Sequence, residues 1–369
     1  WGLRVSAYEF TDESVLKALK DAHERKADVQ ILYHAKNDAQ KKLNEARIAK
    51  FGMGDYCHAR VSKGLTLSHN KIIVLTKKGV AQAVLTGSTN FSVGGIYGHS
   101  NVVHISEENR LSKKYLWLWN ELSKNEETKV VAPVLATASP LPVDTTTAGT
   151  IPIFSPRPNL EALEYYAARA TEANDALFMT FAFGMHPMFQ DAYRNGTAKL
   201  RYALMEKMSG PTKTAAEREA NEAKIISLRK LVQNKFAIGA FLPLGAFDHW
   251  LRERLTGLNV NVRYLHTKYM LIDPLGRNPL VVTGSANFSV ASTENNDENM
   301  LAIRGDTRVT DIYLGEFMRL YNHFAFRDFL SNAKNPNEAE VSHLDETDKW
   351  WKRYFGKSFA ARQREYFAG

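Results

Sequence analysis

The sequence HTKYMLID at residues 266–273, followed by GSANFS at 284–289, has a counterpart earlier in the chain. The earlier copy reads HNKIIVLT at 69–76 and GSTNFS at 87–92. The distance from the histidine to the glycine is 18 residues in both copies, from 69 to 87 and from 266 to 284. Two complete copies in the same order and at equal spacing indicate that the chain consists of two homologous halves.

The residue types in the two copies predict a phosphate site. His-x-Lys followed by an apolar run alternates like a strand, so His69 and Lys71 share one face, as do His266 and Lys268. The Gly-Ser-x-Asn turns add a hydroxyl, an amide and backbone N–H groups. Imidazole, ammonium, amide and hydroxyl groups together are suited to holding a phosphate and attacking it.

At these residues the chain resembles the phospholipase D superfamily, whose signature is H-x-K-x4-D followed by G-[GS]-x-N. The resemblance covers most of the chain. It implies an α/β fold of two homologous α/β/α sandwich halves with mixed, mainly parallel sheets, related by a pseudo-twofold axis. It also implies a hydrolase of the phosphodiesterase class that uses the HKD motif without a metal or other cofactor. Phospholipases, phosphatidyltransferases and nucleases all share this signature, so it does not define the substrate.

The resemblance assigns roles to the motif residues. The superfamily is known for a two-step route through a phosphohistidine, which makes His69 and His266 the nucleophile and the general acid. Lys71 and Lys268 would hold the non-bridging oxygens. The phosphate cradle would be completed by Ser88, Asn90, Ser285 and Asn287. Each half would supply one side of a single site, so one chain suffices and no oligomer is required.

The two copies differ at their acidic positions. Asp273 occupies the Asp position of the signature, where the first copy has Thr76. Glu298 follows the second copy, and aligning the segments behind the motifs makes Ser100 its counterpart. Both carboxylates are therefore predicted to act as orienting residues in the second half.

The identity of the nucleophile stays open at this point. In related nucleases a carboxylate at the Glu298 position holds the non-reacting ring nitrogen of the catalytic histidine. This predicts that Glu298 supports His266 and favours His266 as the nucleophile. Family precedent favours His69 instead.

Patterns around the motifs predict the elements of each half. Strands are expected at 2–10, 28–34, 176–183 and 199–205, and helices at 11–25, 108–124, 159–173, 187–194 and 306–332. Four aromatic residues on the helices behind the motifs are expected in the core: Tyr115, Trp119, Tyr313 and Phe317.

The same patterns divide the chain into parts. We expect a first half at 1–130, a linker rich in Pro, Thr and Ala at 131–158, a second half at 159–332 and a tail at 333–369. The second half carries an insertion at 206–263, whose centre at 214–235 reads as a polar helix that either borders the substrate channel or is simply solvated. The apolar stretch at 236–250 is expected to be buried, with a loop that enters lipid as the alternative.

Aromatic and basic residues are interleaved in the tail, from Trp350 to Phe367. Such a mixture could stack bases and neutralise phosphates. The favoured expectation is that the aromatic side chains pack the tail onto the body while the charges face water.

The composition narrows the partners. A net charge of +8 and a pI near 9.3 favour a polyanion, either nucleic acid or an anionic membrane surface. Cys57 is the only cysteine, which excludes an internal disulfide and a cysteine-based zinc site. No carboxylate cluster has metal-site spacing, so no metal or cofactor is expected. We expect a cytoplasmic protein whose natural chain extends upstream of Trp1.

Three functions are compatible with these residues. The leading hypothesis is a metal-independent nuclease that acts on DNA or RNA. The alternative is a phospholipase D or phosphatidyltransferase that acts on phospholipid head groups. The third is an inactive module that binds a phosphate backbone without turnover.

Overall fold

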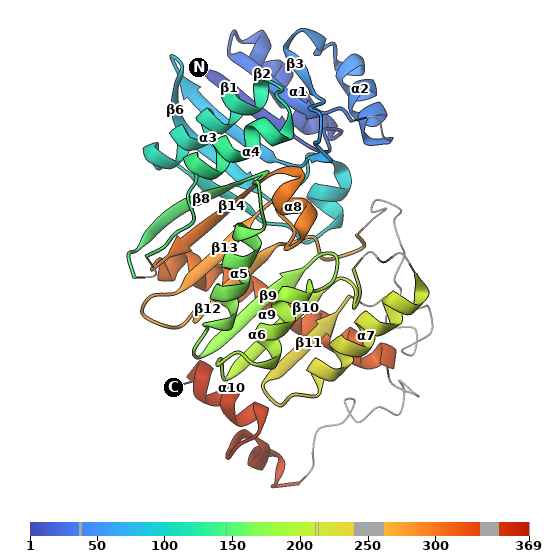
Figure 1. Ribbon diagram of the computed structural model, residues 1–369, viewed down its shortest axis with the longest axis vertical. Helices are drawn as coiled ribbons and strands as arrows, with labels where there is room; N and C mark the ends of the chain where they lie inside the picture. Colours follow the sequence, from blue (N-terminus) through green and yellow to red (C-terminus); the bar gives the residue numbers. More distant parts are fainter. Residues whose placement is uncertain are drawn as a thin grey trace. The chain divides into compact units, whose positions relative to one another are not determined.

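The computed structural model describes residues 1–36, 39–144, 146–210, 212, 214–239, 262–332 and 347–368 (Figure 1). It divides into two compact units. Unit 1 comprises Trp1–Tyr166, His266–Tyr269 and Val282–Arg304, and unit 2 comprises Ala167–Leu265, Met270–Val281 and Gly305–Gly369. Most of the apolar stretch 236–250 and the start of the tail lie outside the described residues.

Unit 1 contains a mixed six-stranded sheet in the order β3-β2-β1-β5-β6-β7. Its strands are β1 (Gly2–Ala7), β2 (Asp28–His34), β3 (Cys57–Arg60), β5 (Lys71–Lys77), β6 (Val80–Gly87) and β7 (Val103–Ser106). β1, β2 and β3 run parallel, whereas β5, β6 and β7 form antiparallel pairs that continue from β1. The predicted α/β fold with mixed sheets is confirmed.

The antiparallel part of this sheet begins at the first motif strand. The first motif strand, β5, turns back into β6 through Lys78 and Gly79, both of which have positive φ angles of 49° and 78°. Such a two-residue turn joins neighbouring strands only as an antiparallel hairpin. The Lys-Gly pair between the two apolar runs was the available sequence signal.

Helices cover both faces of this sheet. α1 (Glu13–Glu24) begins at Asp12, whose carboxylate accepts the N–H groups of Ser14 and Val15, and it packs with α2 (Ala39–Phe51) on one face. α3 (Asn109–Ser123) lies on the opposite face, where the guanidinium of Arg4 lies over the ring of Trp119. The predicted core positions on this helix, Tyr115 and Trp119, are buried.

The predicted linker at 131–158 is mostly ordered structure. It holds the end of α4 (Thr128–Ala138) and all of β8 (Gly149–Ser155), which pairs antiparallel with β14 (Asn296–Arg304). Ile153 and Phe154 are buried, which explains why the segment does not remain an open connection. β14 also pairs with β4 (Leu67–Ser68), next to the first motif.

The remaining elements of unit 1 come from the second copy. They are the end of β13 (Leu280–Gly284), the short helix α8 (Val290–Glu294) and the start of α5 (Glu161–Thr171). The chain passes between the units within β12 (Tyr269–Ile272) and β13. The His-Lys pair and the Gly-Ser-x-Asn turn of the second motif therefore belong to the same unit as the first motif.

Unit 2 repeats the strand pattern of β1, β2, β3 and β5. β9 (Ala176–Phe181), β10 (Leu200–Met205) and β11 (Asn234–Ile238) run parallel, and β12 pairs antiparallel with β9. α6 (Pro187–Arg194) contacts α7 (Ala215–Arg229), while α9 (Thr307–Asn332) provides Phe317 to the core. The predicted polar helix thus ends at residue 229, and β11 follows it.

The tail meets its prediction only in part. In α10 (Phe359–Ala368) the rings of Phe359 and Tyr366 pack on the β-sheet residues Tyr202 and Phe178. In contrast, the turn Trp350–Tyr354 leaves its two tryptophans largely exposed. Within the described ranges, no helix is both long and apolar enough to cross a membrane.

Candidate active site

The structure brings both His-x-Lys pairs into unit 1 and buries them there. His69 and His266 are each 5% exposed, and Lys71 and Lys268 are each 1% exposed. Lys71 Nζ donates to the backbone carbonyl of His69, and Lys268 Nζ donates to that of His266. The two pairs therefore have the same local geometry.

Each motif begins against the chain that follows the other motif. The backbone N–H of His69 donates to the carbonyl of Asp297 over 3.0 Å, and that of His266 donates to the carbonyl of Ser100 over 3.1 Å. Position 69 of the first copy corresponds to position 266 of the second, and position 100 corresponds to position 297. Both pairs of positions are 197 residues apart. The two halves of the site therefore exchange equivalent bonds.

Glu298 lies against His69. His69 Nδ1 and Glu298 Oε2 are 2.9 Å apart, and both side chains are buried. Burial alone would raise the pKa of Glu298, but the charge and hydrogen bond of His69 hold that pKa below its ordinary value. An ionised carboxylate only accepts hydrogen bonds, so Nδ1 carries the proton and Nε2 of the neutral ring presents a lone pair.

Asn101 takes the equivalent place beside His266. Its Oδ1 lies 2.9 Å from His266 Nδ1, while its Nδ2 donates to the carbonyl of Gly95 over 2.7 Å. Because the amide nitrogen already donates to a carbonyl, the oxygen faces the imidazole and accepts from its Nδ1–H. Both histidines thus direct Nε2 away from their supporting residue.

These contacts correct the expected alignment and the expected role of Glu298. Glu298 supports His69, not His266, and its counterpart is Asn101 instead of Ser100. The backbone fixes this register, because Ser88 N–H donates to Val102 and Ser285 N–H donates to Asn299, each over 2.9 Å. A shift of one residue exchanges the faces of a strand. The alignment, which was wrong by one residue, therefore assigned the carboxylate of Glu298 to the wrong histidine.

The motif serines hold the supporting residues. Ser88 Oγ donates to Asn101 Oδ1 over 2.9 Å and accepts from the N–H of Val102. Ser285 Oγ accepts from the N–H of Asn299, the residue next to Glu298, over 3.0 Å and donates to the carbonyl of Asn299 over 3.3 Å. The predicted contact of both serines with a phosphate stays a prediction.

The motif glycines are required by a close approach of chains. A Cβ at Gly87 would lie 2.1 Å from the carbonyl oxygen of Val102, and one at Gly284 would lie 2.2 Å from that of Asn299. Any side chain would separate the motif strand from the strand that carries the supporting residue. This explains why the signature has glycine before the serine.

Burial dominates the electrostatics of the site. It lowers the pKa of His69 to about 4, against the opposing effect of Glu298. Burial and the charges of Lys268 and Lys71 hold the pKa of His266 well below its ordinary value. Burial also lowers the pKa of Lys71 to about 7 and holds that of Lys268 well below its ordinary value. A negatively charged ligand would raise all four pKa values.

The asparagines of the two turns leave polar atoms available. The amide oxygens of Asn90 and Asn287 are buried, and neither has a hydrogen-bond partner among the residues that the structure describes. Buried polar groups are normally satisfied, so a pair of equivalent exceptions marks a place where a ligand or water completes the bonds. No group of three or more His, Cys, Asp or Glu side chains in the described ranges is placed to hold a metal ion.

Asp273 has a different role from the expected one. It lies in unit 2, and its carboxylate accepts the backbone N–H groups of Asn174, Asp175 and Ala176 at the start of β9. This fastens the chain entering β9 to the end of β12. The prediction that Asp273 orients a site residue is therefore corrected to a structural role.

Two positions near the histidines were missed by sequence reasoning. The ring of Tyr8 lies 4.9 Å from that of His69, and the ammonium of Lys71 lies 5.2 Å from the centre of the same tyrosine ring. The ring of His99 lies 5.1 Å from that of His266. Neither residue belongs to a motif, so spacing could not single them out.

A buried ion pair also escaped the sequence reading. Arg60 Nε and Nη2 donate to the two carboxylate oxygens of Asp297 over 3.0 and 3.1 Å, and both side chains are at most 1% exposed. Asp297 precedes Glu298 and accepts the N–H of His69 through its backbone. The pair therefore fixes the piece of β14 that supports His69.

Helix α3 has one face toward the site and one toward solvent. Tyr115 OH donates to Asn299 Oδ1 over 2.8 Å, and Asn299 in turn donates to Asn70, which lies between His69 and Lys71.

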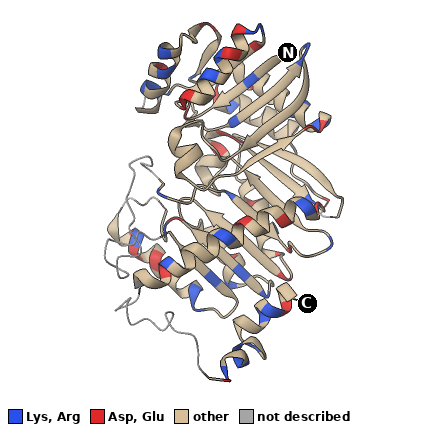
Figure 2. Ribbon diagram, turned by 180° about the vertical axis from the view of Figure 1, so that it is seen from behind, with Lys and Arg blue, Asp and Glu red and all other residues tan. Residues whose placement is uncertain are grey.

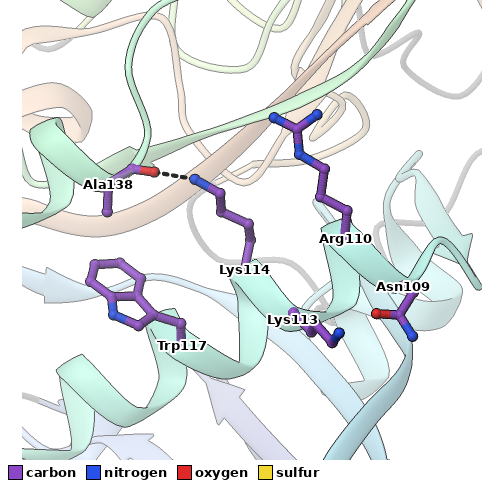
Figure 3. A pocket seen from close by; sticks show the side chains of 6 residues that line it. All are labelled: Asn109, Arg110, Lys113, Lys114, Trp117 and Ala138. Carbon is purple, nitrogen blue, oxygen red and sulfur yellow. Dashed lines mark hydrogen bonds between the residues drawn. The ribbon is translucent and has the colours of Figure 1, made fainter.

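On the outer face a hollow of about 680 Å³ is lined by Asn109, Arg110, Lys113, Lys114, Trp117 and Ala138 (Figure 3). No motif residue lines this hollow.

Comparison with known proteins agrees with this geometry. The family model described as "Cardiolipin synthase, PLD-like domain" matches residues 2–121 and 225–321. The chain therefore belongs to the phospholipase D superfamily. A relative named phospholipase D from Rickettsia bellii is 34% identical over 115 residues, which are 31% of this chain and 52% of the relative. The chain thus spans about half the length of the relatives it matches.

Two solved structures share the fold. The phosphatidylserine synthase of Haemophilus influenzae superposes with a TM-score of 0.59 and 13% identity, covering 88% of this chain and 81% of that one. The polyphosphate kinase of Porphyromonas gingivalis superposes with a TM-score of 0.52 and 12% identity, covering 86% and 45%. At these identities the likeness concerns the fold alone.

Proposed function

We propose that this protein is a phosphodiesterase that works through a phosphohistidine and without a metal ion, and that its substrate is nucleic acid. One observation carries the proposal: two His-Lys pairs are buried in one unit, where the charges of His69 and Lys71 act on His266, and each imidazole is oriented through Nδ1 by a residue of the other copy. Two oriented imidazoles and two ammonium groups supply a nucleophile, an acid and charge neutralisation.

The asymmetry of the supporting residues assigns the two histidines. A carboxylate stabilises positive charge on the ring it contacts, and an attacking imidazole becomes positively charged as its bond to phosphorus forms. Glu298 therefore suits His69 as the nucleophile. His266, supported by the neutral amide of Asn101, then acts as the general acid and base. The contact with Glu298 and the family precedent favour the same histidine.

The reaction then has two balanced steps. In the first, Nε2 of neutral His69 attacks phosphorus while the P–O bond to the leaving group breaks. His266, protonated on both nitrogens because the bound anion raises its pKa, gives its Nε2 proton to the departing oxygen. In the second, His266 takes a proton from water, the hydroxide oxygen attacks phosphorus, and the P–N bond breaks. Lys71 and Lys268 neutralise the non-bridging oxygens, and Asn90 and Asn287 offer further polar contacts.

The basic surface supports nucleic acid as the substrate. The chain carries a net charge of +8. In unit 1 the hollow on α3 combines Arg110 and Lys113 with Trp117, and neither cation forms an ion pair within the described part of the chain (Figure 3). Cations beside a half-buried ring suit a phosphate backbone with stacked bases.

A second candidate is hydrolysis or transfer of phospholipid head groups. It is favoured by the matched relative, whose name is phospholipase D, and by the name of the family model. The chemistry at phosphorus would be the same. The two candidate functions differ only in the part of the substrate that is attached to the phosphate and lies around the buried His-Lys pairs.

Both candidates are tested with one set of proteins. The wild type and the His69→Ala and His266→Ala variants are incubated in EDTA with labelled single-stranded DNA or RNA, and separately with phosphatidylcholine vesicles. Our proposal expects cleavage of the nucleic acid by the wild type alone. Release of choline with intact nucleic acid would establish the second candidate, and activity that survives both substitutions would refute the proposed site.

A further inference from the structure

The segment 347–368 of unit 2 divides its aromatic residues into two sets. Phe359 and Tyr366 hold it to the unit, since Phe359 lies 5.5 Å from the ring of Tyr202 and Tyr366 OH accepts the N–H of Leu275 over 3.2 Å. Trp350, Trp351 and Phe355 face solvent and are 54%, 46% and 53% exposed. The contacts of Phe359 and Tyr366 therefore hold the segment on unit 2, while the other three aromatic rings remain exposed to solvent.

Basic groups surround the exposed rings. The segment has six basic residues and two acidic ones, and Figure 2 shows Lys and Arg positions in blue on the ribbon near the C-terminus. The guanidinium of Arg364 lies 4.8 Å from the centre of the Phe355 ring, and that of Arg353 lies 5.0 Å from the centre of the Tyr354 ring. Within the described ranges, no carboxylate pairs with Lys349, Lys352 or Arg353.

A hollow of about 510 Å³ lies beside these rings. It is lined by Met318, Tyr354, Ala360, Gln363, Arg364 and Phe367. Arg364 thus lies both on the wall of the hollow and against the exposed ring of Phe355. Flat apolar surfaces and a cation consequently occur side by side.

The composition of the segment favours stacking over insertion into a bilayer. Residues 347–368 contain no Leu, Ile, Val or Met, so the exposed apolar surface consists of aromatic rings and alanine methyl groups. Helices that lie in a membrane surface separate an apolar face from a charged face. Here cations lie directly on ring faces, which places positive charge next to stacking platforms, as a single strand requires.

We propose that residues 349–364 form a binding site for single-stranded nucleic acid, in which bases stack on Trp350, Trp351 and Phe355 while the neighbouring Lys and Arg side chains bind phosphates. This site rests on the proposed function and narrows its substrate to single strands. Duplex DNA keeps its bases inside the helix, so it offers no ring faces to these side chains except at its ends.

The test measures binding without turnover. The His69→Ala and His266→Ala double variant, with an otherwise complete chain, is titrated with a labelled 20-nucleotide thymidine strand, with the matching duplex and with phosphatidylglycerol vesicles. A second protein adds Trp350→Ala, Trp351→Ala and Phe355→Ala. A matched control adds Phe329→Ala, which removes a ring that is 46% exposed on α9 of the same unit.

We expect the triple substitution to weaken single-strand binding roughly 10- to 100-fold and the Phe329 control to leave it unchanged. Quenching of tryptophan fluorescence by the strand should disappear in the triple variant. Equal affinity of the triple variant and its parent, or binding through these residues to vesicles or duplex in preference to the single strand, would overturn the proposal. Melting temperatures equal to that of the parent confirm that the variants are folded.

The outcome is separable from that of the hydrolysis assays. Tail-dependent binding of single strands by a protein that cleaves only phospholipid would leave this site intact and refute the proposed substrate. Cleavage of single strands at equal rates by the wild type and by a protein that carries the three aromatic substitutions with both histidines intact, together with unchanged binding in the titrations, would do the reverse.

Discussion

At the scale of single residues, each copy of the motif supplies the residue that contacts the histidine of the other copy. Glu298 from the second copy holds His69 of the first, and Asn101 from the first holds His266 of the second. The exchange makes the two imidazoles unequal although their surroundings are built alike. A single side chain, a carboxylate against an amide, therefore separates the nucleophile from the acid in this account.

Glu298→Gln should lower kcat by roughly 10²- to 10⁴-fold. Asn296 Nδ2 donates to Glu298 Oε1 over 3.2 Å, so a glutamine would keep its oxygen there and turn its NH₂ toward His69. The ring would then accept at Nδ1 and carry its proton at Nε2, where it cannot attack. Steady-state kinetics check this against Glu107→Gln, an exposed carboxylate that should have no effect.

Lys71 should be needed for activity but should lower the stability of the folded protein. Burial lowers the pKa of Lys71 from 10.5 to about 7. The unfolded chain therefore binds this proton between pH 10 and 7 while the folded protein does not, so stability falls as the pH is lowered through that range. Lys71→Met should be inactive but about 1–3 kcal/mol more stable at pH 7, with a smaller advantage at pH 9.5.

Thermal unfolding of both proteins at the two pH values measures this difference. Inorganic phosphate should raise the melting temperature of the wild type more than that of the variant, because the anion compensates the buried charge. An advantage of the variant that grows toward pH 9.5 would contradict the assigned sign.

At the scale of elements, the fold depends on contacts that join distant strands. The hydrophobic patterns alone predicted strands at 28–34 and 200–205 and helices at 187–194 and 307–332 to within a residue or so. They did so because each element has a clear apolar face. The pairing of β8 with β14 could not be predicted in this way, since a Pro- and Thr-rich segment acquires its order from the partner strand.

Asp273 should matter for stability and not for chemistry. Asp273→Ala removes three backbone hydrogen bonds at the start of β9 and should reduce the free energy of unfolding by about 2–3 kcal/mol. Asp273→Asn, which keeps one acceptor and tolerates the φ angle of 46°, should cost less. Urea unfolding and specific activity are measured together. Loss of activity in a fully stable Asp273→Ala protein would restore the orienting role.

The Arg60–Asp297 pair should behave as a unit. Arg60→Met leaves Asp297 charged and buried, which should cost about 3–5 kcal/mol. The double variant Arg60→Met, Asp297→Leu should recover a large part of that loss, since it leaves no unpaired charge. Denaturant unfolding of the wild type, both single variants and the double variant gives the coupling energy. Additive losses would show that the two side chains act independently.

At the scale of the whole molecule, the sequence was enough to predict the repeat. It did not lead to the correct alignment of the two copies behind the motifs. Equal spacing within the motifs identified the two halves, the two His-Lys pairs and the superfamily. The alignment behind the motifs was wrong by one residue, and the hydrogen bonds from Ser88 to Val102 and from Ser285 to Asn299 correct it. The same 14-residue distance from Gly87 to Asn101 and from Gly284 to Glu298 was the signal that would have sufficed.

The repeat also explains why the compact units differ from the sequence halves. The ion pair of Arg60, the support of His69 and the pairing of β4 with β14 all bind second-copy residues to the first copy. Unit 1 thereby holds both His-Lys pairs. A complete site in one unit is consistent with a protein that acts as a single chain.

The central claim is that His69, supported by Glu298, attacks phosphorus while His266 supplies and removes the proton. The most direct test incubates His266→Ala with bis(p-nitrophenyl) phosphate, whose leaving group needs no acid, and quenches the reaction in denaturant at alkaline pH. Mass spectrometry of the peptides should find the nitrophenylphosphoryl group on His69, because its hydrolysis lacks a base. The group on His266 in the His69→Ala protein, with His69 unmodified in the first variant, would contradict the account.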